Sequence, residues 1–179
     1  MRALFAVALL FFVALSTPLA HAEPVNAATR NTARMLGAEG LKLFDRGEYA
    51  LALEKFRVAN QLVPAPTLGV RAARCLEKLG RLVEASEAFL EVTRQELDRS
   101  APWVHRKAQA EALAEREKLV PRIPSLVVTI EGPVGDGVAI TVDGDEMPAA
   151  LIGQKQSIDP GKHTIEVKRA DKTLTRAIT

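Results

Sequence analysis

The sequence has little of several residue types on which common protein chemistries depend. Its 179 residues include one cysteine, one tryptophan, one tyrosine and six phenylalanines. A single cysteine excludes an internal disulfide framework and a cysteine-based zinc site. Basic and acidic side chains nearly balance, at 24 against 22, which excludes a nucleic-acid binder that depends on a clustered positive excess. The length suits one or two small domains rather than a large enzyme.

Residues 1–22 have the order of a secretory signal peptide. Arg2 supplies a positive charge, an apolar run covers residues 3–15, and a small-residue sequence ends at Ala22. The run is shorter than the roughly 20 residues that span a bilayer, and no cysteine lies nearby to carry a lipid. We therefore expect cleavage after Ala22 and export to the periplasm or cell surface. An uncleaved membrane anchor is the alternative.

The remaining chain divides into two parts of different composition. Residues 23–120 are rich in Ala, Leu, Glu, Arg and Lys, with apolar residues at helical spacing. Residues 126–179 alternate Val, Ile and Thr between turn residues, which is typical of short strands. Prolines in the linker, residues 121–125, stop a helix. The sequence predicts an α+β protein, in which an all-α helical-repeat domain precedes a small antiparallel β-sandwich.

Internal repetition is the strongest signal in the helical part. Five residues recur 33 positions later: Leu43, Gly47, Ala52, Glu54 and Phe56 return as Leu76, Gly80, Ala85, Glu87 and Phe89. This spacing predicts two consecutive helix pairs, with each glycine in a left-handed turn between helices. Small residues are expected where two backbones approach closely, and the phenylalanines are expected to fill the space between pairs.

At these positions the chain resembles the tetratricopeptide repeat family, over roughly residues 34–98. The residues that carry the resemblance are Leu36, Glu39, Gly40, Leu43, Ala52, Phe56 and Pro64 in the first unit and Gly69, Ala72, Ala73, Leu76, Ala85 and Phe89 in the second. Glu39 replaces an apolar residue of the family pattern, and Gly69 lacks the usual large side chain. The resemblance implies stacked helix pairs whose concave face engages a segment of a partner protein.

Residues 101–120 are too short for another pair and are predicted to form one capping helix. Ser100 is the expected N-cap, with Pro102 in the first turn. One apolar face is expected to cover the end of the stack. Its members are Trp103, Val104, Ala108, Ala112 and Leu119.

Three strands are predicted in the C-terminal part, at residues 126–130, 138–142 and 164–168. Asp143 and Gly144 form a hairpin-turn dipeptide, and Pro160 and Gly161 suit a type II turn. Three segments resemble a PEGA domain, a small surface-associated β-module: residues 130–133, 140–144 and 159–164. The first of these keeps only the central Glu-Gly of the four-residue motif.

No residue set in the sequence has the pattern of a catalytic, cofactor or metal site. His105 and His163 lack neighbours at metal-ligand spacing, and Cys75 reads as a buried thiol or as a link between chains. The acidic run at residues 143–146 lacks the pattern of an EF-hand and reads as a solvated turn. We therefore expect a protein that is not an enzyme and needs no cofactor.

Binding is the remaining class of function, and the concave face of the helix pairs is the expected surface. The inward-facing candidates are Arg34, Leu41, Asp45, Val70, Arg74, Glu77 and Lys78. Their charges suit an acidic or carboxylate-ended protein segment, with the β-module spacing or attaching the repeats at the envelope. Two alternatives stay open: the β-module binds cell-wall glycan on a helical spacer, or the chain is a membrane-tethered sensor accessory. The partner's identity and the oligomeric state do not follow from the sequence.

Overall fold

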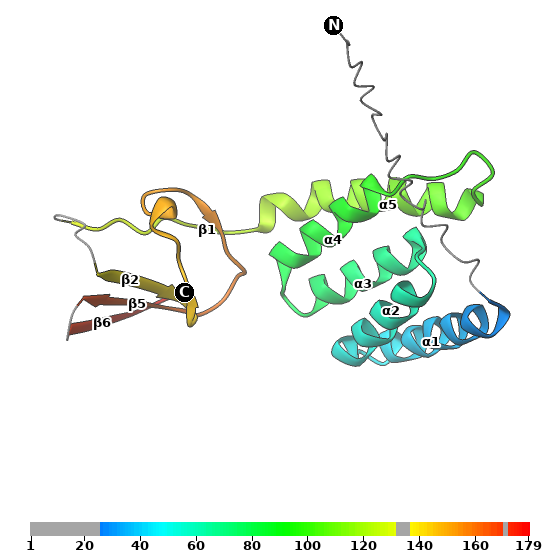
Figure 1. Cartoon of the computed structure of the whole chain (residues 1–179), viewed down its shortest axis with the longest axis horizontal. Coiled ribbons are helices and arrows are strands. Elements are labelled where there is room, and N and C mark those ends of the chain that lie inside the picture. The colour runs from blue at the N-terminus through cyan, green and yellow to red at the C-terminus, as the bar shows by residue number, and fades with distance from the viewer. Residues whose placement is uncertain (1–25, 132–136, 170–171) are drawn as a thin grey trace, which may run out of the picture.

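The computed structural model describes residues 26–131, 137–169 and 172–179. The predicted signal peptide lies outside these residues, as do Gly132 and Pro133 of the motif that resembles PEGA. Within the described residues, five α-helices precede a set of short antiparallel strands in two sheets (Figure 1). The predicted α+β class and the order of the two parts are confirmed.

The helical part is a stack of successive antiparallel neighbours. Helices α1 and α2 pack together, α2 packs on α3, α3 on α4, and α5 contacts both α3 and α4. No helix in the described residues has the length and apolar character needed to cross a membrane. The bounds are α1 (Ala27–Asp45), α2 (Tyr49–Leu62), α3 (Pro66–Lys78), α4 (Leu82–Arg94) and α5 (Trp103–Leu119).

The repeated residues have the same structural roles in both helix pairs. Gly47 and Gly80 have φ angles of 79° and 78°, in the left-handed region that favours glycine. Phe56 and Phe89 are fully buried, and a Cβ at Gly40 would lie 2.8 Å from the ring of Phe56. The 33-residue repetition therefore marks two equivalent turns and two equivalent core positions.

Helix α5 differs from the predicted capping helix at its start. It begins at Trp103 with Pro102 as its N-cap residue, and no side chain caps it. The Ser100 hydroxyl and N–H donate instead to the carboxylate of Asp98, so the expected N-cap is wrong. Ala108, Ala112 and Leu119 are buried as expected, but Trp103 is 65% exposed and Val104 is 38% exposed.

The β-module contains two antiparallel sheets. One pairs β1 (Ser125–Leu126) with β4 (Gln156–Ser157). The other has the order β3-β2-β5-β6, and its strands are β2 (Val138–Val142), β3 (Asp145–Glu146), β5 (His163–Arg169) and β6 (Lys172–Ile178). The prediction of a strand over residues 126–130 is wrong beyond Leu126, because the Val128 carbonyl accepts a hydrogen bond from the loop N–H of Gly153.

The two modules meet at the first turn of α4. The single turn η1 (Val120–Arg122) follows α5 and leads into β1. The Asp159 carboxylate accepts a hydrogen bond of 2.8 Å from the backbone N–H of Val83, so a β-module loop caps a helix whose own N-cap, Arg81, supplies no side-chain bond. Figure 1 shows α4 with this end turned toward the β-module.

Candidate functional site

The candidate site is a hollow of about 490 Å³ between α1, the α2–α3 loop, α3 and α5, called here the basic hollow. A stripe along α1 forms one wall because residues three and four apart share a helix face. Opposite it lie Leu68, Arg71 and His105. The stripe consists of Arg30, Ala33, Arg34, Gly37, Ala38 and Leu41.

The charge of the basic hollow is of one sign. Three arginines and one histidine line it, and no carboxylate does so among the described residues. Burial lowers the pKa of the Arg71 guanidinium from its ordinary value, and the positive charge of Arg74 lowers it further. Arg71 also lies over the ring of Phe56, 6.0 Å from its centroid. A negatively charged group in the hollow would therefore meet arginines and no carboxylate among the described lining residues.

Arg74, one of the predicted site residues, joins α3 to α5. Its Nε lies 3.0 Å from Oε2 of Glu115 and its Nη2 lies 2.9 Å from Oε2 of Glu111. The hydrogen bond to Glu115 raises the pKa of Arg74 above its ordinary value. Both carboxylates already neutralise this guanidinium, so it offers less to an incoming anion than Arg34 or Arg71 does.

The other predicted residues are spread over different surroundings. Arg34 and Leu41 lie in the basic hollow, whereas Val70 is 2% exposed because α5 covers that face of α3. Glu77 forms an ion pair with Arg122. Asp45 and Lys78 are exposed at the ends of their helices and do not line the basic hollow.

Arg71 and His105 line the basic hollow but were not predicted from the sequence. Arg71 follows Thr67 by four residues and precedes Arg74 by three, so the three share one face of α3. This spacing could have been used to predict Arg71 from the sequence. No sequence pattern indicates His105, because it reaches the hollow only through the contact of α5 with α3.

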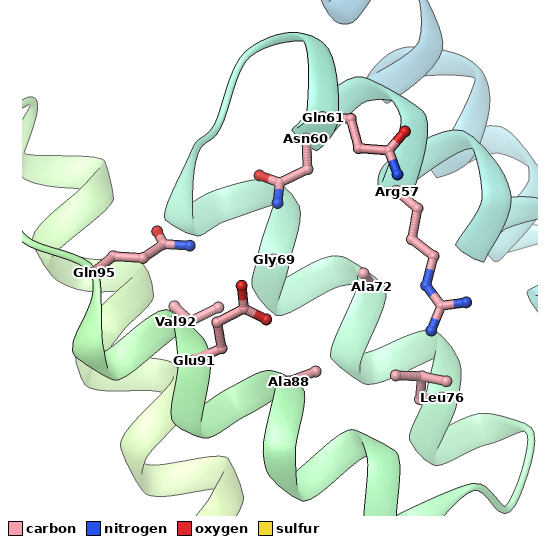
Figure 2. Close-up of a pocket in the computed structure, with 10 residues that line it drawn as sticks. All are labelled: Arg57, Asn60, Gln61, Gly69, Ala72, Leu76, Ala88, Glu91, Val92 and Gln95. Atoms are coloured by element: carbon pink, nitrogen blue, oxygen red, sulfur yellow. The ribbon is translucent and has the colours of Figure 1, made fainter. Parts of the chain in front are cut away.

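A second hollow, of about 250 Å³, lies on the opposite face of α3 (Figure 2). Gly69 and Ala72 form its floor, and α2 and α4 form its sides with polar side chains such as Asn60 and Glu91. A Cβ at Gly69 would lie 2.5 Å from Val92, so the missing side chain at this position lets α3 and α4 approach. Asn60 caps the backbone N–H of Ala65, which indicates a structural role for this face.

Asp143 and His163 form the closest pair of titratable groups among the described residues of the β-module. Nδ1 of His163 lies 2.6 Å from Oδ2 of Asp143, and Nε2 lies 2.6 Å from the carbonyl oxygen of Asp159. The bond to Asp143 raises the pKa of His163, and the same bond lowers the pKa of Asp143. Asp143 and Gly144 form the expected turn, with φ angles of 54° and 92°, and residues 143–146 are exposed as predicted. The hydrogen bond between Asp143 and His163 was not predicted from the sequence.

The remaining reactive groups are not brought together. Cys75 is fully buried in the helical core, and burial raises its pKa to about 11. No group of three or more His, Cys, Asp or Glu side chains is placed to hold a metal ion within the described residues. Neither a family model nor a curated protein nor a solved structure matches the chain.

Proposed function

We propose that this chain is an exported interaction protein without enzymatic activity, whose helical module docks an acidic segment of a partner protein. One observation carries the proposal: the basic hollow places guanidinium groups beside aliphatic walls. Arg34 and Arg71 supply the charge, and Leu41 and Leu68 supply apolar surface. Charged groups that are paired on binding fix the register of a segment, and apolar contacts add affinity.

The repetition over residues 43–89 and the two equivalent helix pairs support a helical repeat of the tetratricopeptide kind. The strand-turn elements at residues 140–144 and 159–164 support a PEGA-like module that spaces or attaches the repeats at the bacterial envelope. The glycan-binding alternative is less favoured, because residues 121–179 contain no aromatic side chain for stacking on a sugar.

A peptide-binding experiment on the chain starting at Glu23 tests the docking site. The probe is a short labelled peptide of alternating glutamate and leucine, followed by fluorescence anisotropy. The variant Arg34→Gln/Arg71→Gln is expected to bind about tenfold more weakly, since two charged contacts are lost and each contributes about 0.5–1 kcal/mol. The matched control, Arg94→Gln/Arg99→Gln, removes the same charge from surfaces outside the hollow. Equal affinities of the two variants for the peptide would show that the peptide binds outside the basic hollow.

Export is tested separately by N-terminal sequencing of the protein from an envelope fraction. The proposal expects a mature chain that starts at Glu23. A chain that keeps residues 1–22 would instead support the membrane-tethered alternative.

A further inference from the structure

The junction between the modules contains a cleft whose charge is opposite to that of the basic hollow. This junction cleft has a volume of about 390 Å³ and lies between the first turn of α4 and the β-module. Five carboxylates line it, and neither lysine nor arginine does so among the described residues. The carboxylates are those of Glu84, Asp143, Asp145, Glu146 and Asp159.

The walls of the junction cleft are aliphatic and only partly covered. Only Val128 and Ile140 are buried among the described apolar residues of the β-module. Five other apolar side chains line the cleft instead, each half-buried: Leu126, Val142, Met147, Leu151 and Ile158. The remaining exposed area of these side chains is apolar surface that a ligand would remove from water.

The carboxylates around the junction cleft fall into two groups. Asp143 and Asp159 are bound within the protein, to His163 and to the N–H of Val83 respectively, and Glu84 pairs with Arg57 and Arg81. Asp145 and Glu146 are exposed on the short edge strand β3 and have no ion-pair partner among the described residues. The two neighbouring carboxylates therefore extend an uncompensated negative rim along the apolar walls.

We infer that the junction cleft is a second docking site, which takes a cationic, apolar segment of a partner protein. Aliphatic side chains of that segment cover Met147 and Leu151, while its lysine or arginine side chains pair with Asp145 and Glu146. The carboxylates of the junction cleft repel an acidic segment that suits the basic hollow. The arginines of the basic hollow repel a cationic segment that suits the junction cleft. The two sites together fit a chain that bridges two segments of opposite charge.

The test measures the affinity of the chain starting at Glu23 for a short labelled peptide of alternating lysine and leucine, blocked at both ends. Asp145→Lys/Glu146→Lys is expected to bind at least about tenfold more weakly. The control Glu87→Lys/Glu91→Lys makes the same charge change on α4, outside the cleft, and is expected to bind as the wild type does. Met147→Gln keeps the side-chain length but removes apolar surface, so it is expected to bind several-fold more weakly.

Three results would overturn the inference. Equal losses in the two charge variants would mean general attraction between opposite charges, and an unchanged affinity of Met147→Gln would mean that the apolar walls are not used. Sedimentation that shows wild-type dimers, but monomers of Asp145→Lys/Glu146→Lys, would make a second copy the occupant. Circular dichroism of each variant separates lost binding from lost folding, and Arg34→Gln/Arg71→Gln should leave this affinity unchanged.

Discussion

At the scale of single residues, the packing of the helical module depends on glycines that leave room for a neighbouring side chain. Phe56 is fully buried against α1, and Gly40 leaves the space that its ring fills. Gly37 lies one turn earlier on the same helix, where a Cβ would be 3.4 Å from Leu68, an ordinary contact. Two glycines of one helix thus differ in whether a methyl group fits.

Gly40→Ala is expected to lower the free energy of unfolding by about 1–3 kcal/mol, because the added methyl group forces the ring of Phe56 or the helix to move. Gly37→Ala is the matched control and should leave stability unchanged or raise it by up to about 1 kcal/mol, since alanine favours a helix interior. Urea unfolding followed by circular dichroism measures both. An equally stable Gly40→Ala variant would contradict the close approach of α1 and α2.

Cys75 is expected not to react with thiol reagents while the protein is folded. Its thiol is buried and its pKa is raised to about 11, so little reactive thiolate is present at neutral pH. A thiol reagent such as Ellman's should react in urea but not in native buffer, and a non-reducing gel should show no disulfide-linked dimer. Rapid labelling of the native protein would show that the side chain is accessible after all.

At the scale of elements, the attachment of α5 to α3 and α4 determines which surface remains open. Arg74 on α3 pairs with Glu111 and Glu115 on α5. The side-chain amide of Gln109 donates to the carbonyls of Val92 and Gln95 at the end of α4. Helix α5 therefore covers the pair formed by α3 and α4, whereas the basic hollow beside α1 remains open.

Arg74→Leu is expected to lower the free energy of unfolding by about 1–2 kcal/mol, because two partly buried carboxylates lose a shared donor. Lys107→Leu is the comparison, since Lys107 pairs with Glu111 at 3.7 Å on an exposed surface and should cost less than about 0.5 kcal/mol. Urea unfolding again provides the measurement. Similar losses in both variants would mean that Arg74 does not hold α5 in place.

The sequence predicted those elements that local patterns determine. Gly47 and Gly80 marked the helix turns, and the dipeptide at Asp143 marked the β2–β3 turn. It did not predict that α5 would turn Trp103 toward solvent, because that depends on packing against two helices at once. For the site, Arg34 and Leu41 share a face of α1 by helical spacing and both line the basic hollow, whereas the pairing of Arg74 required knowing where Glu115 lies in space.

At the scale of the whole molecule, a chain of hydrogen bonds among the described residues joins the two modules. His163 holds Asp143 through Nδ1 and the carbonyl of Asp159 through Nε2, and the carboxylate of Asp159 holds the N–H of Val83. Both ring nitrogens face oxygen acceptors, so only the doubly protonated imidazolium satisfies both bonds. Protonation of His163 thus stabilises the loop whose Asp159 holds the β-module against α4.

The direction of the pH effect follows from the two pKa shifts. The pKa of His163 is raised above its ordinary value of 6.5, so its contribution is complete below that pH and is lost as the pH rises through the raised pKa. The pKa of Asp143 is lowered from 3.8, so its contribution is present above that value and is lost on acidification. The polar chain is therefore strongest in mildly acidic solution, between the lowered pKa of Asp143 and the raised pKa of His163.

Raising the pH from about 6 to about 9 is expected to loosen the β-module, because the neutral ring of His163 gives up one of its two bonds. Small-angle X-ray scattering should then show a larger radius of gyration, while circular dichroism shows unchanged helices. Asp159→Ala removes the bond to Val83 and should give the larger radius already at about pH 6. Asp98→Ala, which loses only a loop contact with Ser100, should behave as the wild type. If Asp159→Ala and the wild type scatter identically at both pH values, the β-module is held against α4 by its apolar contacts and not by the polar chain through His163.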